Sequence, residues 1–197
     1  MTLFRWALTL AVIAGVGGCA KLLGYSDGGA KAAPIKQYPD GPEGLKAFFD
    51  DVLESTKKDD RDHVHDLMAS TRMSDAELQR LFGAQAAALQ SRYKKLMETL
   101  INPGSMELIT QIYERKLDTV EVVPIDPTAK EASAEDKAVA AALKVPLKWY
   151  SVRVRKATDQ RGLRYDFYFY ADAKWVTGNQ IAKSLEGYHA PDGGAPK

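Results

Sequence analysis

Apolar residues recur at helical spacing through the first half of the chain. The first stripe starts just after Pro42 and contains Leu45, Phe48, Phe49, Val52 and Leu53. Steps of three and four residues place these side chains on one face of a helix. After the charged segment "KKDDRD" the pattern resumes at Val64, Leu67 and Met68. The chain is therefore expected to begin its folded part with two amphipathic helices.

A third helix is expected to start at a capping box. Ser74 and Glu77 have the required spacing and precede an apolar periodic run. The stripe continues through Leu78, Leu81, Phe82, Leu89, Tyr93, Leu96, Met97, Leu100 and Ile101. This predicts a long helix that ends at "NPG", residues 102–104, because proline and glycine usually stop a helix. A further short helix would then carry Met106, Ile109, Ile112 and Tyr113 on one side.

Strand patterns dominate from Leu117 onward. The segment "TVEVVPI" predicts a first strand, and the alanine-rich stretch that follows it predicts a helix over 133–143. Apolar and polar residues then alternate strictly in "PLKWYSVRVRK" and in "GLRYDFYFYAD", which is the signature of half-buried strands. The segment "KWVTGNQI" can return as another strand after a turn near Asp172, with Trp175 buried.

The two alternating strands are expected to form a hairpin. Pairing Val154 with Tyr165, Val152 with Phe167 and Tyr150 with Phe169 puts the apolar residues on one face. A slip of one residue would mix the two faces. In this register Arg153 faces Asp166, and the opposite charges favour the pairing. Tyr165, Phe167 and Phe169 are interpreted as core residues.

The order of elements indicates an α+β protein, in which N-terminal amphipathic helices pack on a C-terminal, mostly antiparallel sheet. This order, together with the closing "ADAKWVTG", resembles the cystatin-like cone of the nuclear-transport-factor-two-like superfamily over residues 42–181. The sequence departs from that pattern in two ways. It has a long helix over 78–101, and it shows little sign of the strand that often follows the first helices. Members include enzymes, ligand carriers and structural domains, so the resemblance implies a fold and no single function.

The N-terminus has the layout of a bacterial export signal. In "MTLFRWALTLAVIAGVGG" a single charge, Arg5, precedes an apolar stretch that is short for a membrane span. Val16, Gly17 and Gly18 lead into Cys19, and this run resembles the lipobox of bacterial lipoproteins. The resemblance implies cleavage before Cys19 and lipidation of that residue, where two or three chains hold a protein firmly. The alternative is a free or buried cysteine beside an uncleaved anchor.

These features divide the chain into four parts. Residues 1–18 would be the signal peptide, 19–41 a flexible tether rich in Gly, Ala, Pro and Lys, 42–185 one α+β domain, and 186–197 a disordered tail. Ala20 is not the aspartate associated with retention in the inner membrane, so the periplasmic face of the outer membrane is the favoured location. The expected membrane contact is the N-terminal lipid.

Composition excludes several classes of function. Cys19 is the only cysteine, so its lipidation would leave none for a disulfide, a thiolate nucleophile or a metal site. Residues 19–197 carry 26 basic and 26 acidic side chains, a balance that favours neither nucleic acid nor an acidic surface. The sequence contains no nucleophile elbow, P-loop, zincin or dinucleotide-binding motif. These observations lower the expectation of an enzyme.

Two histidines among carboxylates form the first candidate site. Asp62, His63, His65 and Asp66 could bind zinc on a loop or a strand. On a helix, however, His63 and His65 point about 200° apart around the axis, so they cannot face one ion. We therefore expect a polar helix start with no metal, and nothing in the sequence implies a cofactor.

The second candidate combines arginines with aromatic side chains. Its members are Trp149, Arg153, Arg155, Arg164, Tyr168 and Tyr170. If they share a sheet face, they could bind a carboxylate, a glycan or a phosphate. The alternative is an exposed face that carries Arg and Tyr for solubility and strand propensity, or a face that the helices cover. The favoured interpretation is a lipid-anchored envelope protein with a non-enzymatic docking or structural domain and another envelope protein as its partner; the alternatives are a small-ligand carrier and an enzyme.

Overall fold

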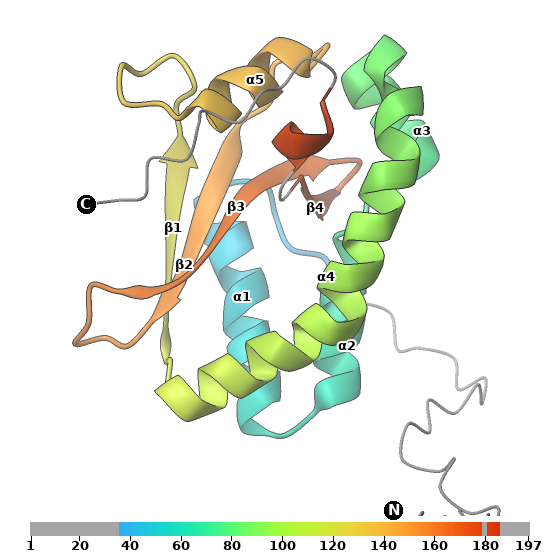
Figure 1. Cartoon of the computed structure of the whole chain (residues 1–197). Helices are drawn as coiled ribbons and strands as arrows, with labels where there is room; N and C mark the ends of the chain where they lie inside the picture. Colours follow the sequence, from blue (N-terminus) through green and yellow to red (C-terminus); the bar gives the residue numbers. More distant parts are fainter. Residues whose placement is uncertain (1–35, 179–180, 186–197) are drawn as a thin grey trace, which may run out of the picture. The chain divides into compact units, whose positions relative to one another are not determined.

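The computed structural model describes residues 36–178 and 181–185 (Figure 1). The expected signal peptide, the lipidation residue Cys19, most of the tether and the tail over 186–197 lie outside these residues. Among the helices of the described part, none is both long enough and apolar enough to cross a membrane.

Three short helices open the fold. They are α1 (Pro42–Lys57), α2 (Arg61–Ser70) and α3 (Asp75–Phe82). Asp60 caps α2, since its side chain accepts a hydrogen bond from the backbone N–H of His63 at 3.1 Å. The capping box of α3 is confirmed: the Ser74 hydroxyl accepts from the Glu77 N–H, and the Glu77 carboxylate accepts from the Ser74 N–H. Local polar signals thus set where α2 and α3 begin.

The long helix differs from the prediction at both ends. A 3-10 turn, η1 (Gly83–Gln85), separates α3 from α4 (Ala86–Arg115), and Gly83 has φ of +56°. The expected stop at residues 102–104 is wrong, because α4 continues through Pro103 to Arg115. Proline lacks one N–H and crowds the preceding turn. Burial of Tyr93 and Met97 before it, and of Leu108 and Ile112 after it, outweighs that local cost.

Four strands form one antiparallel sheet within the described residues, in the order β1-β2-β3-β4. They are β1 (Thr119–Ile125), β2 (Trp149–Arg155), β3 (Gly162–Ala171) and β4 (Lys174–Thr177). The helix α5 (Ala134–Ala142) connects β1 to β2, and the 3-10 turn η2 (Ile181–Ser184) follows β4. The expected α+β class is confirmed, and so is the helix predicted over 133–143.

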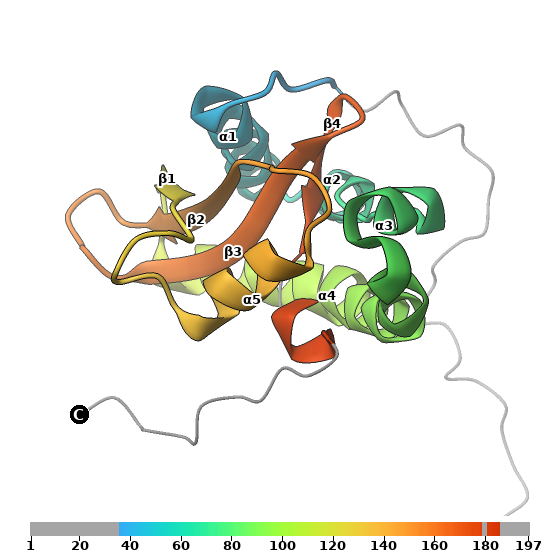
Figure 2. The ribbon, with the colours of Figure 1, turned by 90° about the horizontal axis from the view of Figure 1, so that it is seen from above.

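The sheet lies between two layers of helices. Seen from above, α1 covers one face, while α5, η2 and the first half of α4 lie on the other side (Figure 2). Each face has its own apolar core. The first core includes Phe48, Phe49, Leu108, Val152, Tyr168 and Trp175. The second core includes Tyr93, Met97, Val139, Trp149, Phe167 and Phe169. Helix α4 contributes to both cores, its first half to the second and its last turns to the first.

The expected hairpin register is wrong: next to the turn Val154 pairs with Leu163, two residues from the expected partner Tyr165, and β3 also contains a bulge. Val152 pairs with Tyr165, whereas Tyr150 pairs with Tyr168, so one extra residue of β3 lies between these two pairs. Phe167 in this segment has φ of +62°. A bulge reverses the faces to which later side chains point. Phe167 therefore enters the second core, and Tyr168 enters the first, although simple alternation predicted the opposite grouping.

The folded part begins before Pro42. Tyr38, which the sequence places in the tether, is only 5% exposed, and its ring packs edge-on against Phe48 with centroids 5.3 Å apart. The Trp175 indole N–H also donates to the Pro39 carbonyl at 3.2 Å. These contacts fix Tyr38 and Pro39, two of the last residues of the expected tether, against the domain. The expectation that Trp175 is buried is confirmed.

Candidate binding site

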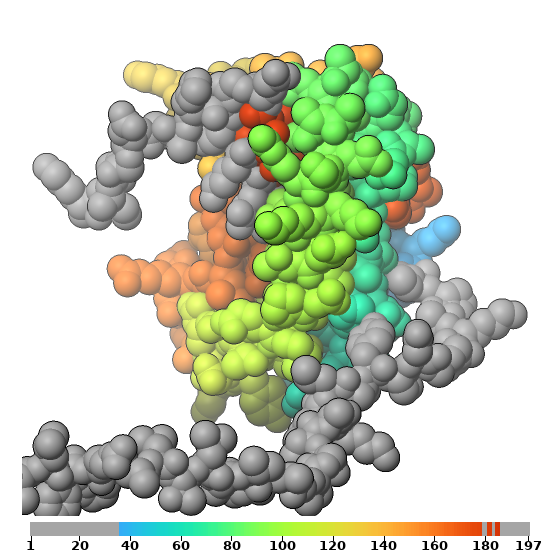
Figure 3. Space-filling view, turned by 45° about the vertical axis from the view of Figure 1, so that its right-hand side comes forward, coloured from blue at the N-terminus to red at the C-terminus, as the bar shows by residue number. Residues whose placement is uncertain are grey.

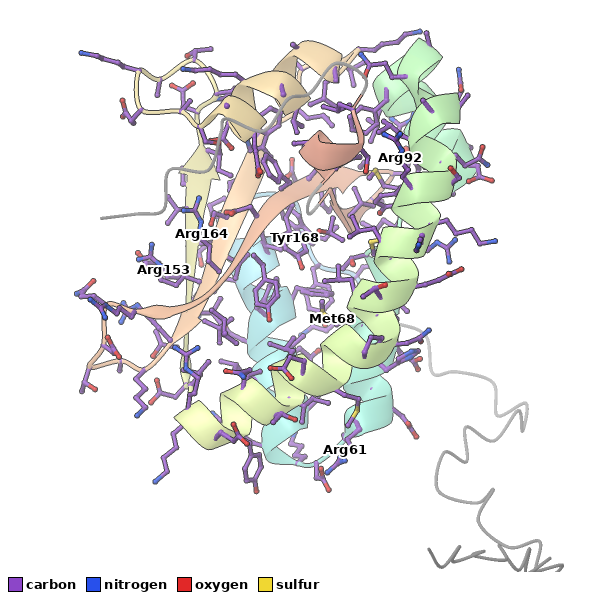
Figure 4. The ribbon with its side chains drawn as sticks, in the orientation of Figure 1. Arg61, Met68, Arg92, Arg153, Arg164 and Tyr168 are labelled. Carbon is purple, nitrogen blue, oxygen red and sulfur yellow. The ribbon has the colours of Figure 1, made fainter. Side chains whose placement is uncertain are left out.

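Arg153 on β2 and Arg164 on β3 are direct cross-strand partners. The sequence expectation that Arg153 faces Asp166 is wrong, because this end of the hairpin pairs two residues away from the expected register. Both side chains are accessible, at 37% and 57% exposure. Figure 4 shows the two arginines on a part of the sheet over which no described helix lies. Like charges opposite each other destabilise a strand pair, so this juxtaposition is a local cost to folding.

The third arginine, Arg155, has a structural role in the hairpin. Its Nε donates to the Glu121 carboxylate at 3.2 Å. Its Nη1 donates to the carbonyls of Lys156, Ala157 and Asp159, at 3.1 to 3.3 Å. These bonds fasten the β2–β3 turn, whose tip stands out beside α4 in the space-filling view (Figure 3). The Arg155 guanidinium is therefore occupied by bonds within the hairpin and the sheet.

Arg153 and Arg164 are paired less completely. Arg153 Nη1 lies 3.8 Å from the Glu121 carboxylate, which makes a shorter contact with Arg155. Arg164 uses its Nε for both of its contacts, 2.8 Å to Asp166 and 3.2 Å to the Ser151 hydroxyl. These two guanidinium groups therefore make fewer contacts with the protein than the guanidinium of Arg155 does.

A surface cleft of about 330 Å³ includes both arginines, and we call it the arginine cleft. Val123, Ser151, Arg153 and Arg164 contribute from the strands, and Glu131 and Asp136 contribute from the segment between β1 and β2. Strand alternation places Ser151 and Arg153 on one face of β2. The 126–133 segment reaches the same face because α5 packs over the second core.

Two carboxylates at the cleft are held by their own turns. Asp126 accepts hydrogen bonds from the Thr128 hydroxyl and N–H, at 2.7 and 2.8 Å, and these bonds hold the pKa of its carboxyl below the usual range. Asp136 completes a second capping box with Ser133 at the start of α5. Local bonding of this kind explains their position without any ligand.

The aromatic members of the predicted site lie elsewhere. Trp149 is buried in the second core between Phe167 and Phe169, and its indole N–H has no hydrogen-bond partner among the described residues. Tyr168 is buried in the first core against Phe49. Tyr170 packs on Trp175 on that same side of the sheet. The expectation that Tyr168 and Tyr170 share a face with the arginines is therefore wrong, and the bulge is the reason.

The histidine pair is divided between two environments on α2. His63 lies 3.8 Å from Asp51, whose carboxylate also accepts a 2.6 Å hydrogen bond from Tyr38. His65 lies 3.3 Å from the Asn102 side-chain oxygen. The described residues contain no group of three or more His, Cys, Asp and Glu side chains that could hold a metal ion.

Sequence reasoning missed Ser151, Glu131 and the other walls of the cleft. Ser151 could have been found, because it alternates with Arg153 on β2. The approach of residues 126–133 to the arginines carries no sequence signal, because it depends on how α5 packs. Comparison with models of protein families, with curated proteins and with solved structures finds no match to this chain. The resemblance to the nuclear-transport-factor-two-like superfamily stays a prediction.

Proposed function

We propose that this protein is a lipid-anchored component of the bacterial cell envelope whose α+β domain docks onto another envelope protein and is not an enzyme. Cys19 carries the lipid in this proposal, and the arginine cleft is the docking surface. The favoured location is the periplasmic face of the outer membrane.

The observation that carries the docking role is the Arg153–Arg164 pair. Two arginines opposite each other on neighbouring strands repel, and the pair lies at an accessible cleft. Both cores, by contrast, are filled by large side chains, including Tyr168 and Phe49 on one face and Trp149 and Phe169 on the other. This packing favours docking at the surface over a carrier that encloses its ligand.

The anchor is tested by Cys19→Ser in the full chain. Growth with an alkyne fatty acid should label the wild-type protein and leave the variant unlabelled. The variant should also leave the membrane fraction. Labelling that persists in Cys19→Ser would remove the anchor from the proposal.

Native mass spectrometry of the full chain, purified in mild detergent from the host, separates docking from the carrier alternative. We expect the mass of the lipidated chain with no small molecule retained. A small molecule retained by the wild type and lost in Arg153→Gln would instead establish a ligand carrier. Arg61→Gln, at the distant start of α2, is the matched control (Figure 4).

A further inference from the structure

We infer that the partner protein adds an extended, apolar segment to the free edge of β1, where it continues the antiparallel sheet. This inference rests on the proposed docking function and deepens it, because the end of β1 also forms a wall of the arginine cleft. It assigns the contact to backbone hydrogen bonds and gives the bound segment a chemical character.

The two edge strands of the sheet differ in how they are protected. β4 has only four residues, and its last one is tied to the helices. The Thr177 N–H donates to the Thr71 carbonyl at 2.9 Å, and the Thr177 carbonyl accepts from the Tyr93 hydroxyl at 2.9 Å. β1 has seven residues, and within the described part of the chain β2 is the only strand that pairs with it (Figure 1). Such an edge presents N–H and C=O groups to an incoming strand.

β1 also lacks most of the devices by which proteins prevent pairing at an edge. Its seven residues pair with β2 without a register shift, so no bulge bends the edge away. Its one charged side chain, Glu121, contacts Arg153 and Arg155 on the neighbouring strand. Pro124 lacks an N–H, but it stands near one end of the strand. Residues 119–123 therefore offer a regular edge for strand addition.

The side chains of β1 define the kind of segment that fits. Val120 and Val122 pack on the first core, and Ile125 packs on the second. Val123 is 43% exposed, and it lines the arginine cleft together with Pro124. β-branched and aromatic residues stabilise such neighbours when they lie across from them on an adjacent strand. An extended segment of alternating β-branched residues is thus complementary to this edge.

The position of Pro124 favours a different protein over a second copy of this chain. Two copies that pair along the full length of β1 would each bring Pro124 into the new ladder, where it cannot donate a hydrogen bond. A segment of another protein can pair with residues 119–123 alone and avoid the proline.

The test uses the full-length protein in non-ionic detergent and the blocked peptide acetyl-Lys-Thr-Val-Thr-Val-Thr-Val-Lys-amide at millimolar concentration. Hydrogen–deuterium exchange with mass spectrometry is the measurement. We expect the peptide to slow amide exchange in residues 119–125 and to leave residues 174–177 of β4 unchanged. The same peptide with its two central residues N-methylated is the control probe. Neighbouring N–H groups point to opposite edges of a strand, so this peptide can use neither edge and should give no protection.

Two valine substitutions of similar exposure make the result specific. Val123→Lys places a charge at the edge and should raise the peptide concentration needed for half-maximal protection about tenfold or more. Val145→Lys, at a position that is 37% exposed between α5 and β2, is the matched control and should behave like the wild type.

Unchanged exchange in residues 119–125, equal protection by the methylated peptide, or equal effects of the two lysine substitutions would each overturn the inference. A dimer in native mass spectrometry that dissociates in Val123→Lys would assign the edge to a second copy and would overturn it too. If strand addition fails while lipid labelling still depends on Cys19 and no small molecule is retained, the proposed docking through side chains of the arginine cleft stands without it.

Discussion

The hydroxyl of Tyr93 in α4 donates a 2.9 Å hydrogen bond to the carbonyl of Thr177 at the end of β4. The same hydroxyl accepts a 2.9 Å bond from the backbone N–H of Met73, just before α3. All three residues are buried, so one phenol satisfies two backbone groups that water cannot reach. Burial raises the pKa of this phenol above its ordinary value, which keeps the donor proton in place.

Tyr93→Phe should destabilise the domain by about 2 kcal/mol, because it removes the bond to the Thr177 carbonyl and leaves the buried N–H of Met73 without its partner. The free energy of unfolding in urea is the measurement. Tyr113→Phe on the same helix removes a hydroxyl from a side chain that is 68% exposed, and it should change nothing measurable. Equal effects of the two substitutions would contradict the bridging role of Tyr93.

Ala173→Gly should stabilise the protein by about 1 kcal/mol. Asp172 and Ala173 form the turn between β3 and β4 with φ of +51° and +59°, a conformation that favours glycine. Ala88→Gly, at an exposed position inside α4, is the matched control and should destabilise by a similar amount. Urea denaturation midpoints that move in the same direction for both variants would refute the strain at Ala173.

Glu77→Gln should lose stability at pH 7 and much less at pH 3. Burial opposes the charged form of Glu77, but hydrogen bonds at Ser74 and the 3.2 Å ion pair with Lys174 outweigh it and hold the pKa of the carboxyl below its ordinary value. A group whose pKa is lowered by folding stabilises the native state above its unfolded pKa, about 4.3 for glutamate, and loses this contribution as the pH falls.

Glutamine can still accept the capping-box hydrogen bond, so the substitution isolates the charge. The measurement is the difference in the free energy of unfolding between wild type and Glu77→Gln from pH 7 to pH 3. A constant difference over this range would show that the carboxylate charge makes no contribution.

Arg155→Gln should cost about 1 kcal/mol, whereas Arg153→Gln should stay within about 0.5 kcal/mol of the wild type. Arg155 fastens the hairpin through Glu121 and three carbonyls. Arg153 makes one long ion pair and faces another arginine, so its removal also relieves repulsion. Thermal or urea unfolding distinguishes them, and an equally large loss in Arg153→Gln would assign Arg153 to the fold instead of the cleft.

Local sequence signals predicted most of the elements. Periodicity placed α1 and α2, the Ser74 and Glu77 spacing placed the start of α3, and strict alternation placed β2 and β3. These signals are reliable because a cap or an amphipathic stripe involves residues within a few positions of each other. The antiparallel α+β class followed from the order of the elements.

The failures share a cause that is not local. Pro103 would stop an isolated helix, but α4 passes through it because residues on either side are buried in two different cores. The bulge near Phe167 sends neighbouring aromatic residues to opposite faces, and no alternation pattern can show where a strand gains a residue. That bulge also determined the candidate site, since it took Tyr168 and Tyr170 away from the arginines.

The sequence by itself determined the helical stripes, the caps, the strand alternation and the presence of arginines on two neighbouring strands, because each depends on residues close together in the chain. Only the tertiary structure decided that Arg153 faces Arg164 and that residues 126–133 form a wall of the cleft beside them. Both depend on strand register and on the packing of α5 over the second core, where the burial of distant apolar residues outweighs local preference.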